Sequence, residues 1–283
     1  MILTLQSDMC GSALEDVLDF YGQHGLSQLD AKTGLDGEPV ETMTESTARE
    51  FAARVAARGM QTYTLSTSLF AVPSDDDEAI RRESERLIAL RPVIDAIAPR
   101  YVRVLAPTGP AVASAAVRAL AASADAISRS GAELLIENGP QDSVVSSPAD
   151  AATFFAALGQ ASSAIGMIWD VQNMWQCGWF PRGDELDTLG DAVRYVHVKG
   201  GRADDGRSGG PLVWASALTE ASWPVERLIE RILEAPHVEA VALNPSHGRL
   251  RAGETPEDIR DTDIEFLKCR LTPSECDLSE GRP

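Results

Sequence analysis

The sequence predicts a single (β/α)8 barrel, and three observations support that prediction. Apolar strand-like runs alternate with longer helical patterns along most of the 283 residues. The alternation gives eight strand–helix units, which is the number and approximate length that such a barrel needs. No GxGxxG motif follows the first strand, as it does in many doubly wound nucleotide-binding sheets. An open doubly wound sheet shows the same alternation and stays the alternative architecture.

Each element can be assigned in order from its pattern. The strand candidates lie near residues 2–6, 26–32, 60–66, 101–106, 132–137, 165–171, 194–199 and 238–244. The helix candidates lie near residues 12–24, 45–58, 78–98, 112–130, 148–162, 183–192, 223–235 and 256–270. Residue types that favour helix starts or ends stand at Ser12, Thr44, Thr255, Gly25, Gly59 and Gly131. We expect one domain over residues 1–271, followed by a polar tail with two prolines over residues 272–283.

Composition narrows the classes of partner and compartment. The net charge of −18 argues against nucleic acid, because counterion release needs a footprint of lysine and arginine. The N-terminal residues lack a basic segment followed by an apolar run, and no stretch approaches the roughly 20 apolar residues that span a bilayer. The four cysteines show no CxxC spacing. The sequence therefore predicts a cytoplasmic protein that binds neither nucleic acid nor membranes.

Three consecutive strand candidates in the second half each end in a side chain that can bind a metal ion. Glu137, Asp170 and His197 each follow an apolar run, and glycine or proline comes shortly afterwards. Each interval between them is about as long as one strand and one helix. In a barrel, the carboxyl ends of neighbouring strands meet at one mouth, so these side chains should converge there. A buried hydrogen-bond network without metal is the alternative interpretation.

The eighth strand candidate adds a fourth position, Asn244, to this set. Oxygen ligands with a single imidazole suit Mn²⁺, Mg²⁺ or Co²⁺ better than a metal that prefers thiolates, and Zn²⁺ stays an alternative. The sequence therefore predicts a divalent metal site.

The motifs LLIEN, IWDVQN and VHVKGG that carry these residues resemble the xylose isomerase-like barrel superfamily. The resemblance covers nearly the whole barrel and is to the sugar phosphate isomerase and epimerase branch, which also includes dehydratases. It implies a divalent ion held by Glu137, Asp170, His197 and a final glutamate. The chain departs from this pattern at Asn244, where that glutamate is expected. It departs again at Asn173, where many members have histidine, and at Gly200, where an acidic residue is common.

These departures bear on the expected chemistry. In the epimerases that the chain resembles, two glutamates on opposite faces of a metal-bound hydroxyketone remove and deliver a proton. An asparagine cannot exchange a proton, so the resemblance leaves one base, Glu137. We expect a metal-dependent isomerase or epimerase acting on a sugar-like or polyol substrate with an α-hydroxycarbonyl group. A lyase or dehydratase on the same scaffold is the first alternative, and a barrel that binds a ligand without catalysis is the second.

Two further residues are candidates for proton transfer. Lys199 lies two residues after His197, so it shares the inward face of its strand and could stabilise an enolate or act as an acid. His247 lies just past the eighth strand and could replace the missing second base. The alternatives are a salt bridge at the barrel mouth for Lys199 and a solvated loop residue for His247.

Five side chains are candidates for substrate binding: Trp175, Trp179, Asn173, Arg202 and Lys32. Aromatic residues stack on the apolar faces of sugar rings, although packing between helices and barrel also explains tryptophans here. Lys32 lies two residues after Asp30 and so shares its face of the strand. An ion pair between these two residues is the alternative to substrate binding. The glycine-rich segment 200–211 is either a lid or a surface insertion. Barrels of this kind often form homo-oligomers, which is a further hypothesis.

Overall fold

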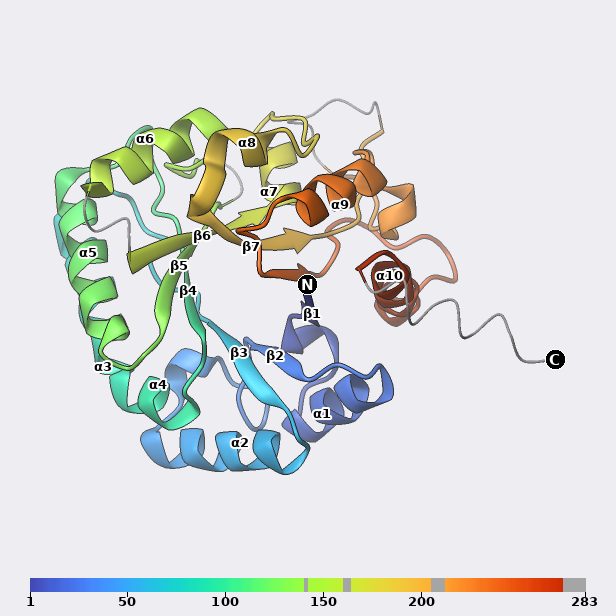
Figure 1. Cartoon of the computed structure of the whole chain (residues 1–283), viewed down its shortest axis with the longest axis horizontal. Helices are drawn as coiled ribbons and strands as arrows, with labels where there is room; N and C mark the ends of the chain where they lie inside the picture. The colour runs from blue at the N-terminus through green and yellow to red at the C-terminus, as the bar shows by residue number, and fades with distance from the viewer. Residues whose placement is uncertain (140–141, 160–163, 205–211, 272–283) are drawn as a thin grey trace.

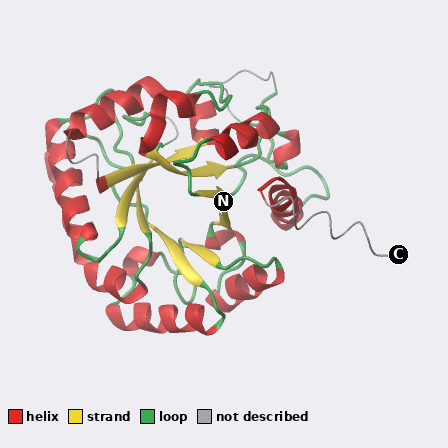
Figure 2. Ribbon diagram, in the orientation of Figure 1, coloured by secondary structure: helices red, strands yellow, loops and turns green. Residues whose placement is uncertain are grey.

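A computed structural model describes residues 1–139, 142–159, 164–204 and 212–271. Eight parallel strands surround a central axis, and helices cover their outer faces (Figure 1, Figure 2). The strands are β1 (Ile2–Leu5), β2 (Gln28–Ala31), β3 (Gln61–Ser66), β4 (Tyr101–Leu105), β5 (Glu133–Glu137), β6 (Ile165–Asp170), β7 (Val193–Val198) and β8 (Ala240–Leu243). The predicted (β/α)8 barrel is therefore confirmed. The predicted tail over residues 272–283 lies outside the described residues.

The strand order closes the barrel almost completely. Neighbouring strands pair in parallel in the order β1-β8-β7-β6-β5-β4-β3-β2. An isolated parallel bridge between Gln6 and Asp30 joins β1 to β2 at the remaining seam. Asp30 therefore lies at the point where the barrel closes.

Helices alternate with the strands as the sequence predicts. They are α1 (Leu14–Gln23), α2 (Glu45–Ala57), α3 (Asp77–Ala89), α4 (Arg91–Ile97), α5 (Ser114–Ser128), α6 (Pro148–Leu158), α7 (Val171–Gln176), α8 (Glu185–Leu189), α9 (Val225–Glu234) and α10 (Pro256–Leu271). Thr44 caps α2, because its side chain accepts from the backbone N–H of Thr47. Gly25, Gly59 and Gly131 adopt positive φ of 68°, 69° and 80° after their helices.

One helix prediction needs correction, and one helix was missed. The helix expected over residues 78–98 is two helices, α3 and α4, which meet at Leu90. Pro92 lies in the first turn of α4 and lacks the N–H that a continuous helix would use there. The helix α7 was not predicted, because it starts directly after β6 without a loop and has only six residues. Asp170 ends β6 and caps α7, so its carboxylate is fixed at the boundary between the two elements.

The apolar core has two parts. The larger one lies between the strands and the surrounding helices and includes Phe51, Phe154 and Trp169. The smaller one lies among the strands, where Tyr63, Tyr101 and Tyr195 pack edge to face. Within the described part of the chain, each helix is too short or too polar to span a bilayer.

Candidate metal centre

Glu137, Asp170 and His197 converge at the carboxyl ends of β5, β6 and β7. Each offers one ligand atom, and these atoms all lie within 4.8 Å of one another. His197 Nδ1 is 3.0 Å from Glu137 Oε1 and 3.8 Å from Asp170 Oδ2. Two ligands bound to one ion at about 2.0–2.2 Å lie roughly 3 to 4 Å apart, so these separations fit a common ion.

Asn244 supplies the fourth side of this cluster. Its Nδ2 lies 2.8 Å from His197 Nδ1 and 3.5 Å from Asp170 Oδ2. Its Oδ1 is buried and has no hydrogen-bond partner among the described residues. The amide thus faces the cluster with its nitrogen, and turning the amide over would bring the unpartnered Oδ1 to the two carboxylates and the imidazole. That donor set suits a hard divalent cation. The residues present therefore fit the metal that the sequence predicts.

Two buried cations balance the carboxylates. Arg103 Nε lies 2.8 Å from Glu137 Oε2, and Lys199 Nζ lies 2.7 Å from Asp170 Oδ2. Arg103 also donates to the backbone carbonyl of Thr67, which fixes its guanidinium. Lys199 thus forms the salt bridge that was its alternative interpretation, yet it lies directly against the ligand cluster.

Burial and neighbouring charges shift the pKa values of Glu137 and His197 in opposite directions. Burial alone would raise the pKa of Glu137, but the charges of Arg103 and His197 hold it well below its usual range. Burial would lower the pKa of His197, but the Glu137 charge and the nearby carboxylates of Asp170 and Asp30 raise it to about 10. Without a metal the imidazole is therefore protonated on both nitrogens near neutral pH. An ion that binds Nδ1 has to displace the proton on that nitrogen.

Two asparagines hold Asp170 in place. Asn138, directly after β5, accepts from the Asp170 backbone N–H at 2.6 Å and donates to its carbonyl at 3.0 Å. Asn173 donates its backbone N–H to Asp170 Oδ1 at 2.9 Å and its side-chain amide to the Asn138 carbonyl at 2.8 Å. The Asn173 amide donor is therefore engaged with the backbone, where it orients the ligand rather than reaching toward a substrate.

The described part of the glycine-rich segment is fixed beneath a short strap, residues 212–216. Within the strap, Trp214 bridges Arg202 on one side and Arg249 on the other, so it connects the loops after β7 and β8. A Cβ at Gly200 would lie 1.7 Å from the Ser216 carbonyl oxygen. The acidic residue expected at this position therefore has no room. Residues 205–211 of the proposed lid lie outside the described residues.

Substituting Gly200 with alanine is expected to destabilise the fold by at least about 2 kcal/mol, because the new methyl group forces the strap away from β7. Urea unfolding measures this loss. Gly22→Ala is the matched control: its Cβ would lie an ordinary 3.8 Å from Met60, inside a helix that alanine favours. Equal stability of the two variants would contradict the close packing of the strap.

His247 lies on the exposed loop after β8. Partial burial, together with the positive charges of Lys199 and Lys32, lowers the pKa of His247, while the Asp170 charge opposes this change. The imidazole is thus neutral at pH 7 and close enough to the cluster to sense its charges.

Two further candidate residues form ion pairs with carboxylates outside the ligand cluster. Lys32 pairs with Asp8 at 2.7 Å, so the predicted ion pair with Asp30 is wrong. Arg202 is about half exposed and lies 3.8 Å from Glu220.

Full burial argues against the predicted substrate contact of Trp175, whereas that of Trp179 stays a prediction. Trp175 is fully buried and packs against Trp223 and Phe180, so a ligand cannot reach it in this structure. Trp179 is exposed, but it lines a surface pocket beside α6 and α8 and donates to Glu185. Helix packing, the alternative interpretation, therefore describes Trp175.

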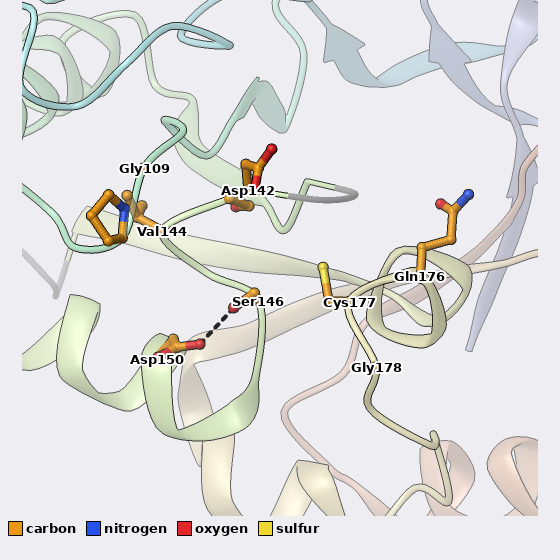
Figure 3. A pocket seen from close by; sticks show the side chains of 10 residues that line it. Gly109, Asp142, Val144, Ser146, Asp150, Gln176, Cys177 and Gly178 are labelled. Carbon is orange, nitrogen blue, oxygen red and sulfur yellow. Dashed lines mark hydrogen bonds between the residues drawn. The ribbon is translucent and has the colours of Figure 1, made fainter. Parts of the chain in front are cut away.

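Two cavities lie among the loops after the strands. One of about 800 Å³ lies among the loops after β4 and β5 and the end of α7, where Asp142, Ser146, Gln176 and Cys177 line it (Figure 3). The other, of about 400 Å³, is lined by Asn244, by residues of α10 and by the loops after β1 and β8. The second cavity shares Asn244 with the candidate metal centre and therefore adjoins it.

Sequence reasoning missed three residues of the centre: Arg103, Asp30 as a neighbour of His197, and Asn138. Arg103 and Asp30 are charged residues within short apolar strands, a pattern that indicates an inward-facing functional group. Asn138 follows Glu137 directly and carries no comparable pattern.

Comparisons with known proteins agree with this geometry. A family model described as "Xylose isomerase-like TIM barrel" matches residues 28–215. No curated protein sequence matches the chain. Among solved structures, the IolI protein with a bound zinc atom is 12% identical, with a TM-score of 0.75 and coverage of 96% of this chain and 99% of that one.

Two other similar structures carry names of enzymes. An L-ribulose 3-epimerase is 15% identical, with a TM-score of 0.73 and complete coverage of both chains, 100% and 100%. The probable 3-DHS dehydratase AsbF from Bacillus anthracis is 15% identical, with a TM-score of 0.71 and coverage of 95% and 99%. At these identities the likeness shows the fold alone.

Proposed function

The chain belongs to the xylose isomerase-like TIM barrel family, and we propose that it is a divalent-metal-dependent isomerase or epimerase of a sugar-like α-hydroxycarbonyl compound. The observation that carries the proposal is the convergence of Glu137, Asp170 and His197 at three adjacent, buried strand ends. Similar structures named as an epimerase, a probable dehydratase and a zinc-bound protein are consistent with it. Mn²⁺, Mg²⁺ or Co²⁺ is the proposed ion, with Zn²⁺ as the alternative.

In this proposal Glu137, Asp170, His197 and Asn244 hold the ion, which when bound polarises the substrate carbonyl and makes the neighbouring C–H acidic. Glu137 is the base. Its low pKa keeps it ionised at neutral pH. Its Oε2 lies 2.8 Å from Arg103 Nε, and this ion pair holds the carboxylate in place.

The proton returns from a different group, because Asn244 cannot carry one. Lys199 lies against Asp170 as an ammonium donor and is the proposed acid. The imidazole of His247 is neutral at pH 7 and can accept a proton rather than deliver one. One base with a separate acid also suits loss of water across a C–C–O unit, so a lyase or dehydratase is the second candidate function.

Metal analysis and isotope exchange test the proposal. The purified protein is expected to retain close to one equivalent of divalent metal, and added Mn²⁺ should raise the melting temperature of the metal-free form. With hydroxyketones such as ketohexoses as probes, deuterium from solvent should enter the substrate carbon, and an absorbing enone product would select the lyase. Less than about 0.1 equivalent of metal with no thermal shift would favour a non-catalytic binding barrel.

Replacing Asn244 with glutamate is expected to tighten Mn²⁺ binding by about tenfold or more, because it adds an anionic ligand beside His197 and Asp170. Titration calorimetry on the metal-free protein measures the change. Ser246→Glu, two residues further along the loop, is the control for added negative charge. Unchanged or weaker affinity in Asn244→Glu would show that β8 contributes no ligand.

A further inference from the structure

Asp30 is a fully buried carboxylate on β2 that faces the interior of the barrel. Its Oδ1 accepts from the Ser66 hydroxyl at 2.5 Å, and its Oδ2 accepts from the Tyr195 hydroxyl at 2.9 Å. These neutral donors do not balance its charge, and burying an unbalanced carboxylate is costly. Lys32, two residues along the chain, is engaged with Asp8 instead.

The cationic partner that Asp30 does face is His197. Asp30 Oδ2 lies 3.7 Å from His197 Nε2. That nitrogen is buried and has no hydrogen-bond partner among the described residues. The other ring nitrogen, Nδ1, faces Glu137 and Asn244. The two ring nitrogens of His197 therefore face different partners.

The Tyr195 side chain restrains the same imidazole. Its ring packs edge to face against His197, with centroids 5.1 Å apart and an interplanar angle of 81°. Its hydroxyl fixes the Asp30 oxygen that faces Nε2. One residue of β7 thus holds both members of the Asp30–His197 pair.

We infer that Asp30 is a positioning residue that holds the proton of His197 on Nε2 and so presents the Nδ1 lone pair to the metal. A histidine that binds an ion through one nitrogen commonly donates its other N–H to a carboxylate, which fixes the ring and its tautomer. Within the ligand cluster, Asp30 faces His197 alone among the described contacts, and it acts through that imidazole. The inference rests on the proposed function as far as the metal is concerned, but not for the orientation of the ring.

Asp30→Asn tests the inference with two measurements. Affinity for Zn²⁺ and Mn²⁺, measured by calorimetry on the metal-free protein, is expected to fall about 10- to 100-fold, the usual loss for such a partner. In the metal-free wild type, proton NMR should show a solvent-protected Nε2–H resonance of His197, which shifts or disappears in the variant. His197→Gln assigns the resonance.

Glu185→Gln is the matched control, because Glu185 is also buried but lies on α8, where it accepts from the backbone N–H of Gly183 and, among the described contacts, touches none of the proposed ligands. It should leave the affinity and the resonance unchanged. If Asp30→Asn does not fold, Tyr195→Phe replaces it. Loss of the hydroxyl frees Asp30 Oδ2, so the resonance should move and the affinity fall by at least about threefold.

The two readouts separate this inference from the proposed function. If the wild type binds no metal, the proposed metal enzyme is rejected. If the Nε2–H resonance is nevertheless present in the wild type and lost in Asp30→Asn, the orienting contact of Asp30 is kept. A wild type that binds metal while Asp30→Asn or Tyr195→Phe leaves affinity and resonance unchanged would overturn the role of Asp30. A loss of the same size in Glu185→Gln would also overturn it, since the effect would then be general to buried carboxylates.

Discussion

Replacing Glu137 with glutamine is expected to weaken divalent-metal binding by at least about 100-fold and to abolish deuterium exchange into the substrate. Glutamine keeps the size of the side chain but removes both the anionic ligand and the proposed base. The loss should exceed the 10- to 100-fold typical of residues that only orient a ligand. Calorimetry with Mn²⁺ and exchange of the substrate C–H in heavy water measure the two effects.

Glu133→Gln is the control for this variant. Glu133 begins the same strand, but its side chain is partly exposed and lies 3.5 Å from Arg194 at the opposite end of β5. It should bind metal as the wild type does. Wild-type metal affinity in Glu137→Gln would show that the three strand ends form a buried hydrogen-bond network, which was the alternative interpretation from the sequence.

Replacing Arg103 with methionine is expected to lower the free energy of unfolding by about 3–5 kcal/mol, because it leaves the Glu137 carboxylate buried with one of its two adjacent cations gone. The bond that Arg103 donates to the Thr67 carbonyl is lost as well. Urea unfolding of the metal-free protein at pH 7 measures the change.

The stability loss in Arg103→Met should also depend on pH. In the wild type the pKa of Glu137 is lowered from 4.5, so its ion pair contributes stability above that pH, which is lost as the pH falls further. Arg103→Met should therefore lose less stability on acidification than the wild type does.

Two comparisons keep the Arg103 prediction specific. Arg194→Met breaks a partly exposed pair with Glu133 and should cost less than about 1 kcal/mol. The double variant Arg103→Met, Glu137→Leu removes both charges and should regain much of the lost stability, since an apolar replacement of a buried pair is often tolerated. A double variant as unstable as Arg103→Met alone would place the cost in packing rather than in the unpaired charge.

Much of the fold could be predicted from the sequence, because each strand has a clear apolar pattern. All eight strands were located, and the boundaries differ by two residues or fewer. The helices were less certain where local chemistry interrupts the period. Pro92 divides one predicted helix, and α7 is too short and too close to β6 to show a period of its own.

The candidate site was predictable only in part, for a physical reason. Glu137, Asp170 and His197 end their strands, so the repeat of the barrel alone brings them together. Arg103 and Asp30 reach the same place from β4 and β2, and their contacts depend on strand register and rotamers that a pattern does not contain. The strand register also shifts between Leu29 and Asp30, which a strict alternation of faces does not anticipate.

The strap over Gly200 decides in which order this centre can be redesigned. At the end of β7, a new carboxylate meets the Ser216 backbone, which a rotamer change cannot move aside. Asn244, in contrast, adjoins a cavity of about 400 Å³, so β8 can take a longer side chain. An engineer who wants a second acid–base group should therefore change β8 first and leave β7 until the strap has been shortened. For the same reason, a substitution at Gly200 should be tolerated better together with a change in the strap than alone.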